Sequence, residues 1–207
     1  MKKFVLFCMS VCVLLAIIGV CGVLTPKGGD TDIAEPSYEE KLEHIRTSGD
    51  YPECFVETAE KCPQTIDYVY NYPLLKDKIF AIDLSAEARS RNVPLFIQWD
   101  ERWGYEPYGS GFIGTSGCGP TCLSMAAVYL TKNAEYSPLY VARMAELNGY
   151  CVPGNGSTWT LISEGGALLG LSVHELPLWE QAMKNALDGG AVLILALGPG
   201  DFTASGL

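Results

Sequence analysis

One stretch, residues 112–130, constrains the fold of this 207-residue chain more than any other. Cys118 stands between two glycines, and Pro120 follows at a position typical of a first helical turn, where a missing N–H costs nothing. Beyond the proline, apolar residues recur at helical spacing, at Cys122, Met125, Ala126 and Tyr129. The pattern predicts a helix with Cys118 at its N-terminal end and these four side chains on its buried face.

This position of Cys118 favours a reactive thiol. Unpaired N–H groups and the positive end of the helix dipole stabilise an anion, and the thiolate is the nucleophilic form of cysteine. Gly117 and Gly119 leave room for a substrate carbonyl to approach the sulfur. A small buried cysteine at a tight turn is the alternative, but this context favours a nucleophile.

Three segments together carry a family resemblance. They are Val93-Pro-Leu-Phe-Ile-Gln-Trp-Asp-Glu-Arg-Trp-Gly-Tyr105, then Tyr108-Gly109, then Ser116-Gly-Cys-Gly-Pro-Thr-Cys-Leu-Ser-Met125. From about residue 93 onward, the chain resembles papain-like cysteine peptidases of the bacteriocin-processing type, whose transporter-linked members cut leader peptides after a double glycine. The resemblance implies an α+β, papain-like fold. It also implies Cys118 as the nucleophile and Gln98 as an oxyanion donor, beside the backbone N–H of Cys118.

The resemblance also predicts what the chain lacks. In the family, the catalytic histidine follows a Phe-Thr-x-x-Gly pattern, which Phe202-Thr-Ala-Ser-Gly206 matches, but only Leu207 follows. We therefore expect a truncated peptidase domain, with the helical lobe largely present and the C-terminal antiparallel sheet incomplete. Without the histidine and its orienting residue we expect no turnover. A non-catalytic peptide-binding module, or pseudo-enzyme, is the alternative.

The two histidines present are expected to have surface roles, His44 on a helix and His174 in a loop. A zinc site is a further alternative, built from Cys118, Cys122, Cys151 and His174, but these residues are too scattered in the sequence to favour it. We predict no cofactor and no metal. A net charge of −10 disfavours nucleic acid as a partner and leaves a peptide or protein substrate.

The N-terminus predicts a membrane attachment. An apolar run of 21 residues, 4–24, follows Lys2 and Lys3 and would form a helix about 31 Å long. We interpret residues 1–24 as an uncleaved signal anchor rather than a cleaved signal peptide, with the remainder outside the cell membrane or secreted. Residues 25–36 form a linker, 37–90 a helical pre-region that serves as a spacer or a lid, and 91–207 the peptidase-like domain.

Within the pre-region, Ser37-Tyr-Glu-Glu40 predicts a capping box that opens a helix. A second helix should run from Tyr51-Pro52 to Pro63, and a third should stop at Tyr72-Pro73. We reject a Cys54–Cys62 disulfide, because these residues would lie about 12 Å apart along one helix.

The later segments have simpler signals. Residues 93–98 are expected to be extended, and the aromatic residues after them to pack as anchors: Trp99, Trp103, Tyr105 and Tyr108. Asp100-Glu101-Arg102 is expected to be a solvated ion group. A helix should begin at Ser137-Pro138 and end before Gly149, with Leu139, Ala142 and Leu147 in the core.

Downstream, a glycine-rich turn over residues 154–159 should precede a helix that ends near Gly170. Residues 178–187 predict an amphipathic helix with four inward side chains: Ala182, Met183, Ala186 and Leu187. Residues 191–197 are apolar throughout, which predicts a strand buried on both faces.

Overall fold

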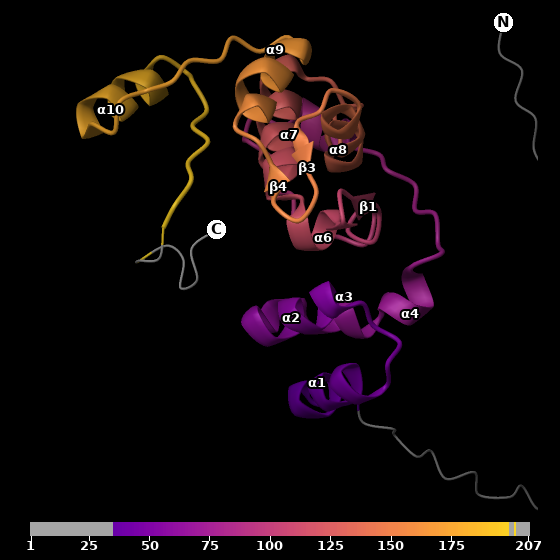
Figure 1. Ribbon diagram of the computed structural model, residues 1–207. Helices are drawn as coiled ribbons and strands as arrows, with labels where there is room; N and C mark the ends of the chain where they lie inside the picture. Colours follow the sequence, from indigo (N-terminus) through magenta and orange to yellow (C-terminus); the bar gives the residue numbers. More distant parts are fainter. Residues whose placement is uncertain (1–34, 199–200, 202–207) are drawn as a thin grey trace, which may run out of the picture. The chain divides into compact units, whose positions relative to one another are not determined.

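The computed structural model describes residues 35–198 and 201, and in this part of the chain the fold is α+β, as predicted. The first half holds α1 (Tyr38–Thr47), α2 (Glu53–Lys61), the 3₁₀ turn η1 (Pro63–Thr65), α3 (Ile66–Tyr70), α4 (Tyr72–Leu75) and α5 (Ser85–Arg89). The second half holds β1 (Pro107–Tyr108), β2 (Gly111–Phe112), α6 (Ile113–Ser116), α7 (Cys118–Thr131), α8 (Pro138–Leu147), β3 (Cys151–Val152), β4 (Gly156–Ser157), the π-helix η2 (Leu161–Gly165), α9 (Gly166–Leu168) and α10 (Glu180–Asp188) (Figure 1).

The predicted membrane anchor over residues 1–24, and nearly all of the linker after it, lie outside the described residues. Among the residues that are described, no helix combines the length and the apolar character needed to cross a bilayer.

The helices of the pre-region begin where their caps predict. Ser37 Oγ accepts a hydrogen bond from Glu40 N at 3.4 Å, and Glu40 Oε2 accepts one from Ser37 N at 2.8 Å, so the predicted capping box is confirmed. The second helix follows Pro52 as predicted, and Cys54 and Cys62 are both free thiols. Pro73 behaves differently from the prediction, because it lies in the first turn of α4 rather than marking only a stop.

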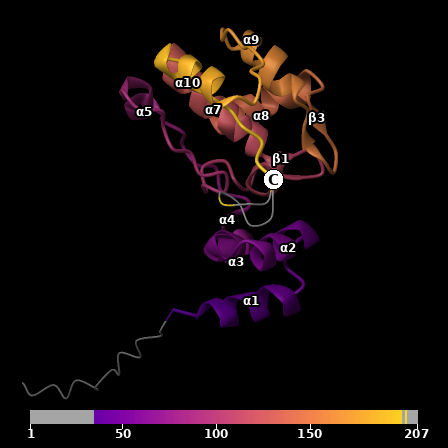
Figure 2. The same ribbon diagram turned by 90° about the vertical axis from the view of Figure 1, so that its left-hand side faces the viewer.

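Aromatic contacts pack the pre-region against residues 104–114. In both views α1 lies beneath α2 and α3 (Figures 1 and 2). The buried cluster that these helices share contains Phe55, Tyr68 and Tyr105. The rings of Tyr68 and Tyr105 stack with centroids 4.6 Å apart, and the rings of Phe55 and Phe112 lie 4.7 Å apart. Tyr68 Oη donates to Gly104 O at 2.6 Å, so the contact is directional as well as apolar.

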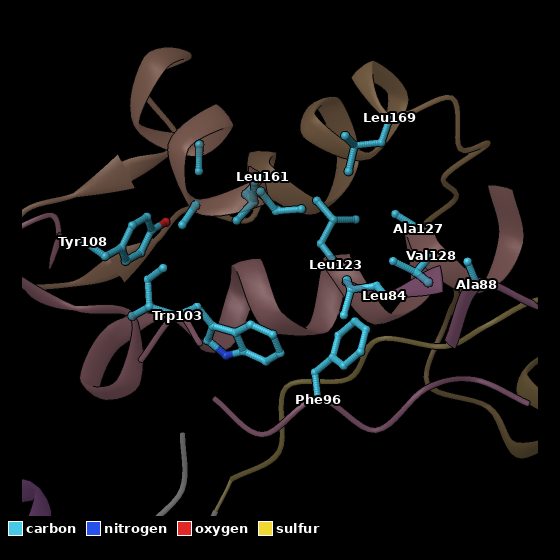
Figure 3. Packing of buried hydrophobic residues seen from close by; sticks show 14 residues of the cluster. Leu84, Ala88, Phe96, Trp103, Tyr108, Leu123, Ala127, Val128, Leu161 and Leu169 are labelled. Carbon is cyan, nitrogen blue, oxygen red and sulfur yellow. The ribbon is translucent and has the colours of Figure 1, made fainter. Parts of the chain in front are cut away.

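The main core surrounds α7. Figure 3 shows Leu123, Ala127 and Val128 of this helix among side chains from other elements, including Leu84, Leu161 and Leu169. The predicted start at Cys118 is confirmed, but the predicted buried face is wrong. Of Cys122, Met125, Ala126 and Tyr129, only Ala126 is fully buried. The sequence of α7 carries apolar residues on nearly all of its faces, so the helical period alone could not identify the face that meets the core.

Helix α8 confirms its predicted ends. Ser137 Oγ accepts from Tyr140 N at 3.2 Å, and Gly149 adopts a left-handed φ of +74° after the last turn. Ala142 is buried as predicted, but Leu147 is 87% exposed. Leu147 lies two residues beyond the buried Ala145, about 200° around the helix, and therefore points away from the core.

The glycine-rich turn belongs to a hairpin that the sequence pattern did not predict. β3 and β4 pair antiparallel, with Cys151 opposite Ser157 and Val152 opposite Gly156. A second short hairpin pairs Tyr108 of β1 with Gly111 of β2. The helical turns of η2 and α9 follow the β3–β4 hairpin and end near Gly170, as predicted.

After residue 178, the prediction for the helix is wrong in part and the prediction of a buried strand is wrong. Helix α10 forms, but the four side chains that were predicted to face the core are at most half-buried, and Leu187 is 53% exposed. Residues 191–197 form no strand. After Ala191 N, which donates to Ala186 O, the backbone of 192–198 makes no hydrogen bond to another described residue. No described strand lies alongside to pair with this segment, and its side chains instead line hollows beside α7.

Residues 93–97 belong to no helix and pair with no strand, and Gln98 already lies in the turn that follows them. Three of the four aromatic anchors are buried as predicted: Trp103, Tyr105 and Tyr108. The Asp100–Arg102 ion pair, at 2.8 Å, is half-buried rather than fully solvated, with Arg102 also lying over the Trp103 ring.

Candidate active site

Cys118 is the first residue of the 14-residue helix α7, and it is exposed. The first hydrogen bond of this helix is donated by Thr121 N to Gly117 O, at 3.0 Å. The amides of Cys118 and Gly119 come before that bond and have no acceptor within the helix, and Pro120 has no N–H. The thiol therefore lies where free backbone donors favour a negative charge.

A cavity of about 430 Å³ opens beside this thiol. Its lining is mostly apolar. It comes from the start of α7, from the end of the β3–β4 hairpin and the residues just after it, from η2 and from the segment 194–197: Cys118, Gly119, Cys122, Ser157, Thr158, Trp159, Ile162, Ile194, Leu195, Ala196 and Leu197. The volume lies within the range of about 300–1,000 Å³ typical of ligand sites. One exposed nucleophilic atom thus adjoins an apolar hollow.

Ser157 lines the cavity and also contacts Tyr108 of the main core. Its Oγ is hydrogen-bonded to the Oη of Tyr108 at 2.6 Å, which links β4 to β1. A Cβ on Gly119 would lie 2.9 Å from Ser157 Oγ, so the approach of α7 to the hairpin requires a glycine there. Burial raises the pKa of Tyr108, so its phenol stays protonated to a higher pH than that of an exposed tyrosine.

Cys122 is the second thiol in the cavity. It is half-buried, and burial together with the nearby Cys118 raises the pKa of its thiol. A thiol that stays protonated is a weak nucleophile. Of the two cysteines that line the cavity, Cys118 is therefore the one available for attack.

Gln98 is held against the turn that precedes Cys118. Its Nε2 donates to Gly114 O at 3.1 Å, and Gly114 N donates to Gly104 O at 2.9 Å. A primary amide has two N–H donors, so this bond leaves the second one for another acceptor. Gln98 is fixed relative to α6, but it is not among the residues that line the cavity.

Tyr68 supports the same turn from the pre-region, a role that the sequence pattern did not predict. An added Cβ on Gly114 would lie 2.2 Å from Tyr68 Oη, so the ring packs directly on the glycine backbone. The hydroxyl bonds to Gly104 O, which also accepts from Gly114 N. Periodicity could not reveal this contact, because Tyr68 and Gly104 are 36 residues apart.

Neither histidine reaches the cavity. His44 is exposed and packs edge-on against Tyr51 and Tyr70, with ring centroids 6.0 and 5.5 Å away. His174 is exposed in a loop, and its Nε2 is hydrogen-bonded to Ser172 Oγ at 3.0 Å. Both surface positions agree with the sequence prediction.

The four residues considered for zinc are not brought together. Cys118 and Cys122 share the cavity, whereas Cys151 lies beside Gly109 and His174 bonds to Ser172. In the described part of the chain, no three His, Cys, Asp or Glu side chains gather as metal ligands.

Sequence reasoning missed several residues of the cavity wall. Ser157 and Thr158 lie in the predicted glycine-rich turn, for which the sequence pattern predicts no functional role. Trp159, at 65% exposure, forms part of the wall. Nothing in the sequence indicated that residues 194–197 line the cavity, because their apolar composition predicts a buried strand instead.

No protein family, no curated protein and no solved structure was found to match this chain. A functional assignment therefore depends on the geometry around Cys118.

Proposed function

We propose that this chain is a papain-like protein of the thiol-hydrolase type, in which Cys118 is the nucleophile toward peptide carbonyls and full turnover requires a proton acceptor that the described cavity lining does not supply. The observation that carries the proposal is the exposed thiol at the first residue of α7, facing a cavity large enough for part of a peptide. The residues that resemble the bacteriocin-processing peptidases add independent support, because they include both Cys118 and Gln98.

The reaction has two steps. Sγ of Cys118 attacks the carbonyl carbon of the scissile bond, the C–N bond breaks, and the amine leaves with the proton that the thiol gave up. This leaves a thioester on Cys118. Water then attacks the thioester, which releases the carboxylic acid and restores the thiol.

The oxyanion that forms during each attack needs hydrogen-bond donors. The backbone N–H of Cys118 has no acceptor within the helix and is one candidate. The second N–H of the Gln98 amide is the other, with the first N–H bonded to Gly114 O as an anchor. We assign Gln98 this role from the family resemblance and from its fixed position next to α6.

The setting of the reaction follows from the sequence. Residues 1–24 would hold the chain in the cell membrane, with the remainder outside, or would direct its secretion. The substrate would then be an extracytoplasmic peptide or protein.

A non-catalytic peptide-binding module is the second candidate. It is favoured by one observation: the cavity lining in the described residues includes no imidazole and no carboxylate. A proton acceptor is needed for efficient turnover, whereas binding to an apolar cavity needs none.

Labelling of the full chain with a peptide vinyl sulfone distinguishes the two functions. We expect covalent labelling of Cys118 that Cys118→Ser abolishes and Cys151→Ser leaves unchanged. Cleavage of a fluorogenic peptide library by the wild type, and not by Cys118→Ser, would support hydrolysis. Peptide binding without covalent labelling would instead support the binding module.

A further inference from the structure

Two free thiols on one helix share the cavity. Cys118 and Cys122 are four residues apart on α7, and both line the same hollow. One helical turn separates such residues by about 6 Å along the axis and brings their Cβ atoms to about 5–6 Å.

This spacing is close to what a disulfide needs. Bridged cysteines have Cα atoms about 4.4–6.8 Å apart and Cβ atoms about 3.5–4.5 Å apart. The Cα separation already fits, and the Cβ atoms need to approach by about 1–2 Å. The turn that must adjust is the first of α7, where Pro120 contributes no N–H and Gly119 no side chain. Residues 118–120 donate no backbone hydrogen bond within the helix, so the first bond that resists the change is the one from Thr121 N to Gly117 O.

The two thiols differ in access, which sets an order of events. Cys118 is exposed and meets a dissolved oxidant first. Cys122 is half-buried one turn further along, so it is shielded from the oxidant but next to Cys118. This is the arrangement of a reactive cysteine with a resolving partner.

We propose that Cys118 and Cys122 form a dithiol modification site that a peroxide converts into an intrahelical disulfide, which turns off Cys118 as a nucleophile. The Cys118 thiolate attacks the peroxide, the O–O bond breaks, and Cys118 becomes a sulfenic acid. Cys122 then gives up its proton, its thiolate attacks the sulfenic sulfur, an S–S bond forms, and the hydroxyl of the sulfenic acid leaves with that proton as water. For hydrogen peroxide the balance is two thiols and one peroxide giving one disulfide and two waters.

The proposal rests on the proposed function in two respects: it takes Cys118 as the reactive thiol and places the chain outside the membrane. An oxidising compartment outside the membrane, where we place the chain, supplies the conditions under which such a bridge forms. Reduction by a small dithiol reverses it and restores the nucleophile.

The remaining described cysteines lack this arrangement and supply controls. Cys151 lies on β3, beside Gly109, and Cys54 and Cys62 lie in the pre-region. None of these three lines the cavity. Cys151→Ser is therefore the matched control for Cys122→Ser.

Trypsin makes the test direct, because the peptide after Arg102 and ending at Lys132 contains only two cysteines, Cys118 and Cys122. After the full chain is treated with hydrogen peroxide and its free thiols are blocked, we expect this peptide to lose the mass of two hydrogen atoms. We expect alkylation of Cys118 to fall to background and to recover after reduction with dithiothreitol. Cys151→Ser should behave as the wild type does.

Cys122→Ser should abolish the two-hydrogen loss and leave Cys118 as a sulfenic acid or a more oxidised form, with Cys122→Ala as a second variant in case the serine perturbs folding. Loss of two hydrogens, with no vinyl sulfone labelling of Cys118 in the reduced chain, would uphold the dithiol site and count against the proposed function. Alkylation of Cys118 that persists after peroxide treatment, with no two-hydrogen loss, would overturn the dithiol site and leave the proposed function standing.

Discussion

Gly114→Ala tests how the pre-region supports the turn before Cys118. The new Cβ would lie 2.2 Å from Tyr68 Oη and 2.5 Å from Tyr68 Cζ, whereas nonbonded atoms settle near 3.5 Å or beyond. The ring or the turn must therefore move by about 1 Å or more. Tyr68 is buried and stacked on Tyr105, so it has little room to withdraw.

Two terms set the size of the effect. Overpacking a well-packed site costs about 1–3 kcal/mol. Displacing the tyrosine also breaks its 2.6 Å bond to Gly104 O, and a buried polar group left without a partner costs about 1–3 kcal/mol. We therefore expect Gly114→Ala to lower the free energy of unfolding by about 2–6 kcal/mol, a large part of a typical domain's stability.

Urea unfolding of the full chain, followed by tryptophan fluorescence, measures this change. The matched control is Gly198→Ala, because an added Cβ there meets no atom of the described residues within 4 Å, and we expect a change within about 0.5 kcal/mol. Tyr68→Leu removes both clashing atoms, so in that background the penalty of Gly114→Ala should shrink to below about 1 kcal/mol. An equal penalty in both backgrounds, or none in the wild type, would refute the proposed packing of Tyr68 on Gly114.

Three further changes have expected outcomes. Burial raises the pKa values of Tyr68, Tyr105 and Tyr108, so above about pH 10 the unfolded chain loses phenolic protons that the folded chain retains. Stability should be unaffected by these groups below that pH and should fall above it by up to about 1.4 kcal/mol per pH unit for each, and urea midpoints that do not change between pH 8 and 11 would contradict this. Ser37→Ala removes the capping box of α1 and should cost about 1 kcal/mol in urea unfolding, whereas the replacement Ser37→Thr, which keeps the hydroxyl, should lose less. Tyr108→Phe removes the hydrogen bond to Ser157 and should lower stability by about 1 kcal/mol, and an unchanged unfolding midpoint would show that this bond contributes nothing.

Local signals in the sequence predicted the helix ends well. The Ser37 capping box, the Ser137-Pro138 start of α8 and the start of α7 at Cys118 all depend on residues within one turn of each other. Such signals act through hydrogen bonds and steric limits inside a short segment, so they do not depend on the tertiary contacts of that segment.

Long-range contacts could not be predicted in the same way. The sequence of α7 is apolar on several faces, and the elements that pack around it, which contribute Leu84, Leu161 and Leu169 among others, determine that Leu123 and Ala127 meet the core. Residues 191–197 have the composition of a buried strand, but a strand also needs a neighbour with which to pair. The hydrogen bond from Tyr68 to Gly104 O also depends on tertiary packing rather than on any local pattern.

The reactivity of Cys118 is the central claim, and site-resolved alkylation measures it most directly. The full chain is treated with iodoacetamide over a range of pH, and the modification of each cysteine is followed by mass spectrometry. Burial raises the pKa of Cys151, whereas Cys118 is exposed at a helix N-terminus, so near pH 7 we expect Cys118 to react about tenfold faster or more. A Cys118 thiol that reacts no faster than Cys151 would contradict the assignment of Cys118 as an activated nucleophile.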